Sequence, residues 1–315
     1  MKIAIDLMGS ENPPLALFDA CIENNIDISF VFIGTFELKR YIEKRLKNGD
    51  VFLIAKNVIF MEENPLFAIR RKKDSSLAIG LKLLKQQKVD AFITAGSTGA
   101  LVSASKLHLD TFKTIHRPAL LASIPGKNKS ISILDVGANI SFKAKFLIDS
   151  AKLGISYSKS KGIKIPKVGL LNIGSEAKKG NAEIQKAYQE LKKLSLKQKK
   201  SFEFVGNIEA LHAFEKDIDV LITDGFSGNV FLKTAEGIAN FLISSLESNI
   251  SQKKLQSLQK YLHHSHYPGA LLIGLKSIVI KCHSYCSLSS FVSAIKGAKT
   301  FIENKIISHI EKNLI

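Results

Sequence analysis

Short, almost continuous apolar runs that end in glycine or a polar residue are the feature that most limits the folds open to this chain. Runs such as KIAID, DAFITAG and VLITDG are too short for typical helices and lack the alternation of a half-solvated strand. Helical spacing follows many of them, as in Ser75–Lys88 and Ala182–Leu194. Buried strands alternating with helices indicate a mostly parallel sheet covered on both faces. The predicted strands are Lys2–Asp6, Ile28–Gly34, Asp90–Gly96, Ile131–Gly137, Lys167–Gly174, Ser201–Asn207, Val220–Gly225 and Ser277–His283.

The predicted architecture is therefore a three-layer α/β/α sandwich. The length of 315 residues permits one large α/β unit or about two domains. Because no linker, repeat or low-complexity tract interrupts the chain, we expect a single catalytic unit over residues 1–315. The alternation stops only at 236–266, where helix-like sequence without a strand predicts a helical hairpin for a dimer or membrane contact, with packing or dimerisation favoured.

The charge of the chain indicates an anionic partner. Its 45 Lys and Arg residues outnumber its 28 Asp and Glu residues, which gives a net charge of +17. Such an excess attracts nucleic acid, anionic lipid, phosphorylated ligands or an acidic protein, although solvated lysine-rich helix faces account for part of it. Three cysteines are too few for a disulfide framework, and Asp6 interrupts the first apolar run too early for a signal peptide. We therefore expect a cytoplasmic protein.

Four strand-to-helix corners share a composition of glycine with small hydroxyl or amide residues. They lie at Thr94–Leu101, Asp135–Lys143, Asn172–Asn181 and Asp224–Asn229. Glycine permits close backbone approach, and the N–H groups at a helix start attract anions. Each corner alone is also what an ordinary turn requires. Because ligands of open α/β sheets bind at the carboxyl ends of the strands, four such corners favour one shared anion site.

Several familiar sites are missing from the sequence. No GxGxxG follows the first strand, and neither GxxxxGK[ST] nor GxSxG occurs. The histidines at 263–266 and the cysteines at 282 and 286 match no closed zinc pattern. Tryptophan is absent, and no basic stretch is interleaved with aromatic residues. We therefore expect no metal, no cofactor and no nucleic-acid partner.

Seven motifs follow one another along the chain: MKIAIDLMGS, TAGSTGAL, RPALLASIPG, ILDVGAN, VGLLNIGSEAKKGN, FVGNIE and TDGFSGNVFLKTAEG. In this order they resemble the bacterial family of acyl-carrier-protein:phosphate acyltransferases of phospholipid synthesis. The resemblance runs from Met1 to about Phe301. It implies transfer of a fatty acyl group from acyl carrier protein to inorganic phosphate, which gives an acyl phosphate. It also implies a homodimer with a fold related to phosphate acetyltransferases and to isocitrate and isopropylmalate dehydrogenases.

The chain departs from the pattern of this family at several presumed site corners. The opening DLMGSENPP lacks the usual second aspartate and histidine. Ser97 replaces an amide, Ser141 replaces an aspartate, and HSYC at 283–286 stands where the family has HGSS. We expect a divergent but active enzyme.

The candidate catalytic residues are Lys233, Asn229 and His283. Lys233 follows Asn229 by one helical turn and can neutralise a phosphate or an oxyanion. Asp224 is expected as a helix cap or an indirect acceptor, since a carboxylate repels phosphate. Each residue also has an ordinary reading: a solvated lysine, a strand-end histidine or a turn asparagine. The predicted phosphate- or substrate-binding residues are Gly96, Ser97, Thr98, Gly99, Asn139, Asn172, Gly174, Asn207, Asp224, Gly225, Ser227 and Gly228.

The expected partners follow from the charge and the resemblance. Acyl carrier proteins are acidic, so basic residues at 70–73 or at 192–193 are docking candidates. Contact with the inner face of the membrane and with a downstream acyltransferase that consumes acyl phosphate is a further expectation. Two rival functions remain: a basic membrane- or nucleic-acid-associated binding protein without activity, and an isocitrate-type dehydrogenase. The dehydrogenase would need a dinucleotide site and paired metal-binding aspartates, neither of which the sequence displays.

Overall fold

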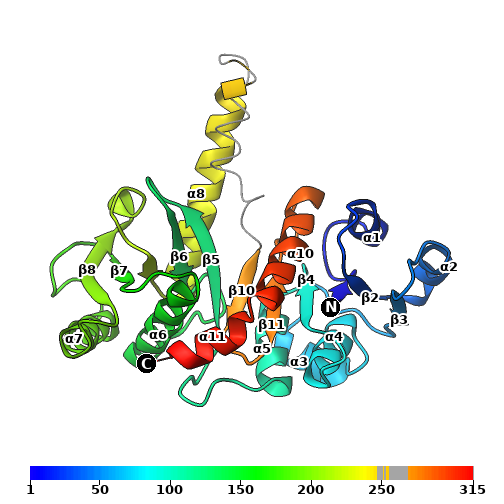
Figure 1. Ribbon diagram of the computed structural model, residues 1–315, viewed down its shortest axis with the longest axis horizontal. Helices are drawn as coiled ribbons and strands as arrows, with labels where there is room; N and C mark the ends of the chain where they lie inside the picture. The colour runs from blue at the N-terminus through cyan, green and yellow to red at the C-terminus, as the bar shows by residue number, and fades with distance from the viewer. Residues whose placement is uncertain (247–250, 252, 255–268, 315) are drawn as a thin grey trace. The chain divides into compact units, whose positions relative to one another are not determined.

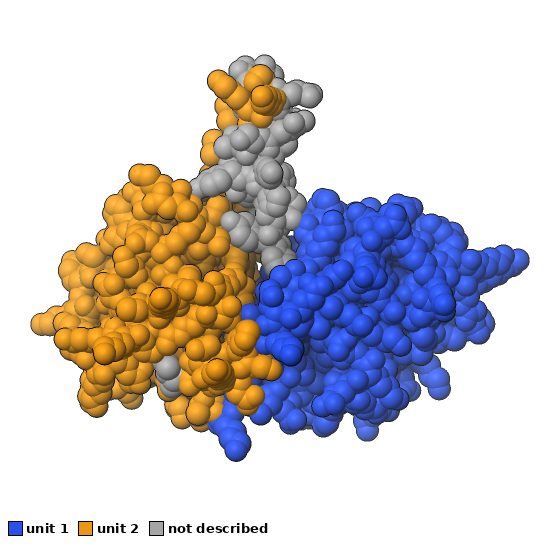
Figure 2. Space-filling view, in the orientation of Figure 1, with its two compact units in different colours: residues 1–113, 267–307 blue, residues 114–266, 308–315 orange. Residues whose placement is uncertain are grey.

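The computed structural model describes residues 1–246, 251, 253, 254 and 269–314 (Figure 1). These residues form two compact units, where the sequence led us to expect one (Figure 2). Unit 1 comprises residues 1–113 and 267–307, and unit 2 comprises residues 114–266 and 308–315. The chain passes from unit 1 to unit 2 between residues 113 and 114, within the stretch TFKTIHRP. This stretch is not rich in glycine, proline or serine, so the composition of the chain does not indicate the boundary.

Unit 1 is built on parallel strands and one antiparallel strand. The strand order is β3-β2-β1-β4-β11-β10, and only β10 runs against its partner, β11. Ile3, Ile5 and Phe92 are fully buried, as expected for strands covered on both faces. The bounds are β1 (Lys2–Asp6), β2 (Ser29–Gly34), β3 (Val51–Ile54), β4 (Ala91–Thr94), β10 (Ala270–Ile273) and β11 (Ile278–Lys281).

Helices cover both faces of this sheet. In Figure 1, α1 (Pro14–Glu23) and α10 (Leu288–Glu303) lie on one face, and α4 (Ser76–Lys85) and α5 (Thr98–His108) lie on the other. Gly80 of α4 approaches the ring of Phe92 so closely that an added Cβ would lie 2.1 Å from it. The remaining elements of this unit are η1 (Phe36–Leu38), α2 (Lys39–Glu43) and α3 (Pro65–Arg71), and α11 (Ile306–Asn313) begins in unit 1 and ends in unit 2.

Unit 2 repeats this plan with five strands in the order β5-β6-β9-β7-β8. Only β5 is antiparallel, since it forms a hairpin with β6. Helix α6 contacts β6 and β9, α7 packs on β8, and α8 contacts β5 and β6. The elements are β5 (Ala119–Pro125), β6 (Ser130–Leu134), α6 (Ala144–Ser160), β7 (Lys167–Asn172), α7 (Ala182–Lys197), β8 (Glu203–Glu209), η2 (Ala210–His212), β9 (Val220–Ile222) and α8 (Gly225–Leu246).

The predicted mostly parallel α/β fold is confirmed, and the predicted hairpin at 236–266 is only partly covered. Its first part belongs to α8, which continues to Leu246, and most of the rest lies outside the described residues. Within the described ranges, no helix combines the length and the apolar content that a membrane crossing requires.

Candidate functional site

Two of the predicted corners in unit 2 touch each other through their backbones. The amide of Gly225 donates to the carbonyl of Asn139 at 2.9 Å. A Cβ at Gly225 would lie 2.6 Å from that oxygen, and a Cβ at Gly228 would lie 2.0 Å from the carbonyl oxygen of Asp135. The first turn of α8 therefore rests on the 135–139 loop, and only glycine fits at these two contacts.

Asp135 organises the 135–139 loop from inside. Its carboxylate is fully buried and accepts the amides of Leu120, Ala138 and Asn139 at 2.7–3.0 Å. Burial raises the pKa of Asp135, while these donors oppose the rise. The Asn139 side chain donates to this carboxylate and to the carbonyl of Pro118, so the structure places it in support of the loop. Asp135 was not among the site residues predicted from the sequence. Its position directly after the apolar run Ile131–Leu134 does indicate that it is buried.

The backbone amides at the start of α8 donate hydrogen bonds to acceptors of the protein itself. The Asp224 carboxylate accepts the amides of Phe226 and Ser227 at 3.0 and 2.9 Å, as expected for a helix cap. The amide of Gly228 donates to the backbone carbonyl of Asp224. At this corner, an anion would therefore contact exposed side chains more readily than unpaired backbone amides. Ser227 and Asn229 are both exposed, and the side-chain amide of Asn229 donates to the carbonyl of Val136 at 3.2 Å.

Lys233 lies one turn further along α8 and forms an ion pair. Its Nζ is 2.7 Å from the carboxylate of Glu236, whose side chain is 17% exposed while that of Lys233 is 38% exposed. Glu236 was not predicted from the sequence, since a glutamate three residues after a lysine is common on a helix surface. The pair places a partly exposed cation on the face of α8 that also carries Asn229.

The third corner of unit 2 is held by two predicted asparagines. The Asn172 side chain donates to the carbonyl of Lys179 at 3.1 Å, and the Asn207 side chain donates to the carbonyl of Glu176 at 2.8 Å. Both asparagines are buried, and Gly174 is also buried within the loop. Since β6, β9 and β7 are parallel neighbours, this loop and the 135–139 and 224–229 corners follow the same sheet edge. In the structure Asn172 and Asn207 shape a loop rich in lysine.

The corner in unit 1 leaves backbone donors open. The Ser97 hydroxyl caps α5 by accepting the amide of Ala100 at 3.4 Å, and the Gly96 amide donates to the hydroxyl of Thr94. Within the described part of the chain, the amides of Thr98 and Gly99 meet no hydrogen-bond acceptor of the protein. These two N–H groups at the start of an eleven-residue helix suit an anion.

A buried polar cluster lies beneath that corner. Asp6 accepts the hydroxyl of Thr94 at 2.8 Å, and Lys281 donates to the carbonyls of Ala95 and Cys282. Burial raises the pKa of Asp6 to about 6, against the opposing effect of its hydrogen-bond donors and of Lys281. Lys281 was not predicted as a site residue, because a lysine inside an apolar strand-like run carries no recognised motif.

The segment around His283 contacts the chain's first loop. His283 is exposed, and its carbonyl accepts the amide of Cys286. The carbonyl of Ser284 accepts the Ser10 hydroxyl at 3.1 Å, and the Asn12 side chain donates to the carbonyl of Cys286 at 2.9 Å. Two of the segments that depart from the family pattern therefore meet in unit 1.

The predicted site residues thus form two groups. The group in unit 2 surrounds the carboxyl ends of β6, β9 and β7, and the group in unit 1 follows β4 and β11. Among the described residues, no three His, Cys, Asp or Glu side chains gather as metal ligands would. Unit 2 holds Asn139, Asn172, Gly174, Asn207, Asp224, Gly225, Ser227, Gly228, Asn229 and Lys233, and unit 1 holds Gly96, Ser97, Thr98, Gly99 and His283.

Solved structures show which class of fold this is. A phosphotransacetylase from Streptococcus pyogenes superposes with a TM-score of 0.64 at 17% identity, covering 96% of this chain and 94% of that chain. A branched-chain phosphotransacylase from Enterococcus faecalis V583 gives a TM-score of 0.62 at 15% identity, covering 97% and 99%. The protein therefore has the α/β fold of the phosphotransacylases.

Sequence comparison then assigns the family. The model of the fatty acid synthesis protein family matches residues 1–309, and the chain belongs to that family. A phosphate acyltransferase from Clostridium acetobutylicum is 39% identical, with 100% of this chain and 99% of that protein covered. A phosphate acyltransferase from Chlamydia pneumoniae is 36% identical over the same shares of the two chains. The resemblance inferred from the motifs is confirmed.

Proposed function

We propose that the protein transfers a fatty acyl group from acyl carrier protein to inorganic phosphate and so forms an acyl phosphate for phospholipid synthesis. The single observation that carries this proposal is the similarity of the entire chain to curated relatives named phosphate acyltransferase. The corners described above supply groups that suit an anionic substrate. The phosphotransacylase fold is compatible with such a reaction, but the fold alone does not identify the substrates.

In the proposed reaction, a phosphate oxygen attacks the carbonyl carbon of the thioester. The carbon–sulfur bond then breaks, the acyl–phosphate bond remains, and the carrier leaves as a thiol after taking up a proton. Phosphate is already a nucleophile, so positioning and charge stabilisation supply the catalysis. No covalent enzyme intermediate and no cofactor is required.

Each unit offers its own candidate groups for this work, according to the donors of its corners. Thr98 and Gly99 would hold anionic oxygens through their amides, with the hydroxyl groups of Ser97 and Thr98 adding hydrogen bonds. Asn229 and Lys233 would stabilise the charge on phosphate or on the tetrahedral oxyanion. Lys233 is the stronger candidate for this charge, since its pairing with Glu236 fixes its position and leaves it partly exposed. His283 remains a candidate proton donor.

Partners and location are further parts of the proposal. An acidic carrier protein would be steered by the excess of positive charge on this chain. Of the basic run at 70–73, Lys72 is held by Glu63, which leaves Arg70, Arg71 and Lys73 as the better docking candidates. We also propose a cytoplasmic homodimer that touches the inner face of the membrane and passes its product to an acyltransferase that uses acyl phosphate. Steered docking predicts that carrier affinity falls as ionic strength rises.

The decisive experiment follows the carrier thiol. Purified protein is incubated with hexadecanoyl carrier protein, with and without inorganic phosphate, and the released thiol and the acyl phosphate are measured. Thiol release that requires phosphate, together with acyl phosphate formation, supports the proposal. Thiol release without phosphate, or none at all, would favour a thioesterase or the non-enzymatic binding protein instead.

A further inference from the structure

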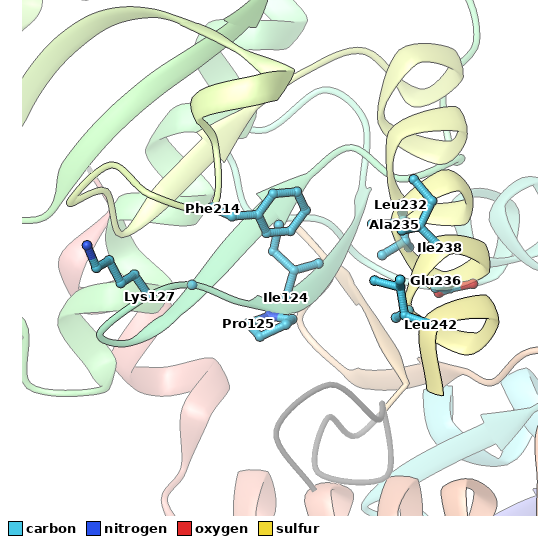
Figure 3. Close-up of a pocket in the computed structure, with 11 residues that line it drawn as sticks. Ile124, Pro125, Lys127, Phe214, Leu232, Ala235, Glu236, Ile238 and Leu242 are labelled. Carbon is cyan, nitrogen blue, oxygen red and sulfur yellow. The ribbon is translucent and has the colours of Figure 1, made fainter. Parts of the chain in front are cut away.

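Unit 2 contains an apolar pocket that no predicted site residue lines. Its volume is about 350 Å³, which is within the range of small-ligand pockets. The tip of the β5–β6 hairpin forms one side, and helix α8 forms the other (Figure 3). The lining residues from β5 and the chain beyond it are Ile124, Pro125, Gly126, Lys127 and Phe214, and those from α8 are Leu232, Ala235, Glu236, Ile238, Ala239 and Leu242.

The walls of the pocket are mostly apolar, and Lys127 and Glu236 are the charged members of the lining. In Figure 3, the ring of Phe214 and the side chain of Ile124 lie opposite α8, with open space between them. On the α8 side, Ile238 and Leu242 are 55% and 46% exposed, which is high for large apolar side chains. The carboxylate of Glu236 is directed away from Phe214 and pairs with Lys233. A hydrocarbon group would therefore find mainly apolar contacts, since Glu236 keeps its ion pair with Lys233 and the Lys127 amine is directed away from α8 in Figure 3.

Helix α8 connects this pocket with the candidate site. Asn229, Lys233 and Glu236 follow one another at helical spacing, and Glu236 is itself part of the pocket lining. At a rise of about 1.5 Å per residue, Asn229 lies about 9 Å along the axis from Ala235 and about 20 Å from Leu242. An extended long-chain acyl group has a length of this order. A carbonyl held near Asn229 would send its chain along α8 into the pocket.

We propose that this pocket binds the hydrocarbon chain of the acyl donor, with the first carbons beside Lys233 and the methyl end between Phe214 and Leu242. The inference rests on the proposed acyl transfer to phosphate. The occupant that it commits to is a saturated long-chain acyl group, because the lining of the pocket is mostly apolar and because α8, which forms one of its sides, also carries the candidate catalytic side chains toward its start.

The first test fills the pocket and compares two chain lengths. Ala239→Phe adds a ring to the lining about 15 Å along the helix axis from Asn229, beyond the reach of a hexanoyl chain. We expect kcat/KM for hexadecanoyl carrier protein to fall by about tenfold or more, and kcat/KM for hexanoyl carrier protein to stay within about twofold. The matched control is Asn240→Phe, at the neighbouring exposed position outside the lining. Equal losses for both chain lengths, or equal effects of both variants, would overturn the inference.

The second test uses the unaltered protein, so it does not depend on how a variant folds. A fatty acid with a photoreactive diazirine at its methyl end is bound and irradiated, and the labelled peptides are mapped by mass spectrometry. The pocket predicts labelling within 232–242, within 124–127 or at Phe214, with competition by hexadecanoic acid. Labelling confined to other peptides would overturn the inference.

These outcomes separate the pocket from the proposed function. If the unaltered protein releases no thiol in response to phosphate with either chain, the proposed function fails, while the labelling still reports whether the pocket binds a hydrocarbon chain. If transfer occurs but both pocket tests are negative, only the pocket fails. Loss of a dimer in Ala239→Phe, measured by light scattering and unaccompanied by a change in chain-length preference, would identify the face as an interface between copies and contradict acyl binding.

Discussion

The starts of α5 and α8 look alike in sequence but use their backbones in opposite ways. Both combine glycine with small polar residues directly after a buried parallel strand. At α5, the amides of Thr98 and Gly99 have no acceptor from the described protein residues. At α8, the amide of Gly225 donates to the carbonyl of Asn139, and the backbone of Gly228 lies too close to the carbonyl oxygen of Asp135 for a Cβ to fit between them. One helix start is open to an anion, and the other is closed by a neighbouring loop.

The difference teaches that glycine in such a corner has two distinct physical roles. At α5 the corner exposes donors, which is the arrangement that binds anions. At α8 glycine permits a backbone crossing that any Cβ would block, and the chemistry there passes to the exposed side chains of Asn229 and Lys233. A glycine-rich motif therefore does not by itself say whether backbone or side chain meets the ligand.

The largest effect that tests this contrast is expected from Gly228→Ala. The added Cβ would lie 2.0 Å from a backbone oxygen, so α8 or the 135–139 loop must shift. We expect a loss of about 4 kcal/mol in the free energy of unfolding, measured by chemical denaturation. Gly237→Ala is the control on the same helix: nothing lies near its added Cβ, and it should gain about 0.5–1 kcal/mol. Similar stabilities of the two variants would refute the close crossing.

The next effect concerns the buried carboxylate beneath the open corner. The pKa of Asp6 is raised from 3.8 to about 6 in the folded state, so the folded protein binds this proton more tightly than the unfolded chain. Its contribution to stability is therefore present below about pH 4 and is lost as the pH rises to about 6, by about 3 kcal/mol in all. Denaturation midpoints at pH 4.5 and 7 should differ less in Asp6→Asn than in the unaltered protein. An unchanged difference would show that Asp6 does not titrate in this range.

Because the backbone donors at the start of α8 are occupied, we expect catalysis at this corner to depend on the side chain of Lys233. Lys233→Ala should lower kcat/KM for phosphate about hundredfold, because the transition-state charge loses its cation, while the fold stays intact by circular dichroism. Lys233→Arg should recover part of this loss. Lys186→Ala, an exposed lysine on α7, is the matched control for removal of one positive charge. If both alanine variants lost activity equally, general electrostatics would explain the effect better than a placed cation.

The smallest effect separates the two helix caps. Asp224 accepts two amides at 2.9–3.0 Å, whereas Ser97 accepts one at 3.4 Å. We expect Asp224→Ala to cost about 2 kcal/mol and Ser97→Ala about 0.5 kcal/mol in the free energy of unfolding. The reverse order, measured by the same denaturation experiment, would show that the α8 start is not the more tightly organised of the two.

Much of this arrangement could be predicted from the sequence, and the rest depends on contacts between distant residues. Uniformly apolar strands such as β1, β4 and β9 were predicted because burial on both faces leaves a clear pattern. The strands β3, β5 and β10 were not predicted; two of them are antiparallel partners and the third, β3, is a short edge strand with exposed and half-buried residues only. Asn172 ends β7 as predicted, whereas Asn207 was predicted to end a strand and lies within β8; the roles of the site residues stay predictions.

The roles that remained hidden belong to residues whose partners lie far away in the chain. Gly228 approaches Asp135 across 93 positions, and Lys281 reaches Ala95 across 186, which no local spacing reveals. The two-unit organisation was missed for a similar reason, since unit 1 contains both the first 113 residues and a segment near the end of the chain. The hydrophobic pattern of a segment predicts that the segment is buried, but it does not predict which other element covers it.

The contact between residues 10–12 and 284–286 makes these two segments inseparable in any exchange with a relative. The side chains of Ser10 and Asn12 donate to backbone carbonyls of Ser284 and Cys286, so a transplanted 10–12 segment without such donors would leave those carbonyls without these partners, and a 284–286 segment with another backbone path would leave the donors without theirs. Chimaeras that carry both segments from one parent should tolerate the exchange, whereas those that mix parents should suffer. Changes in the side chains of residues 10 and 12 are therefore expected to act together with changes in the path of the backbone at 284–286.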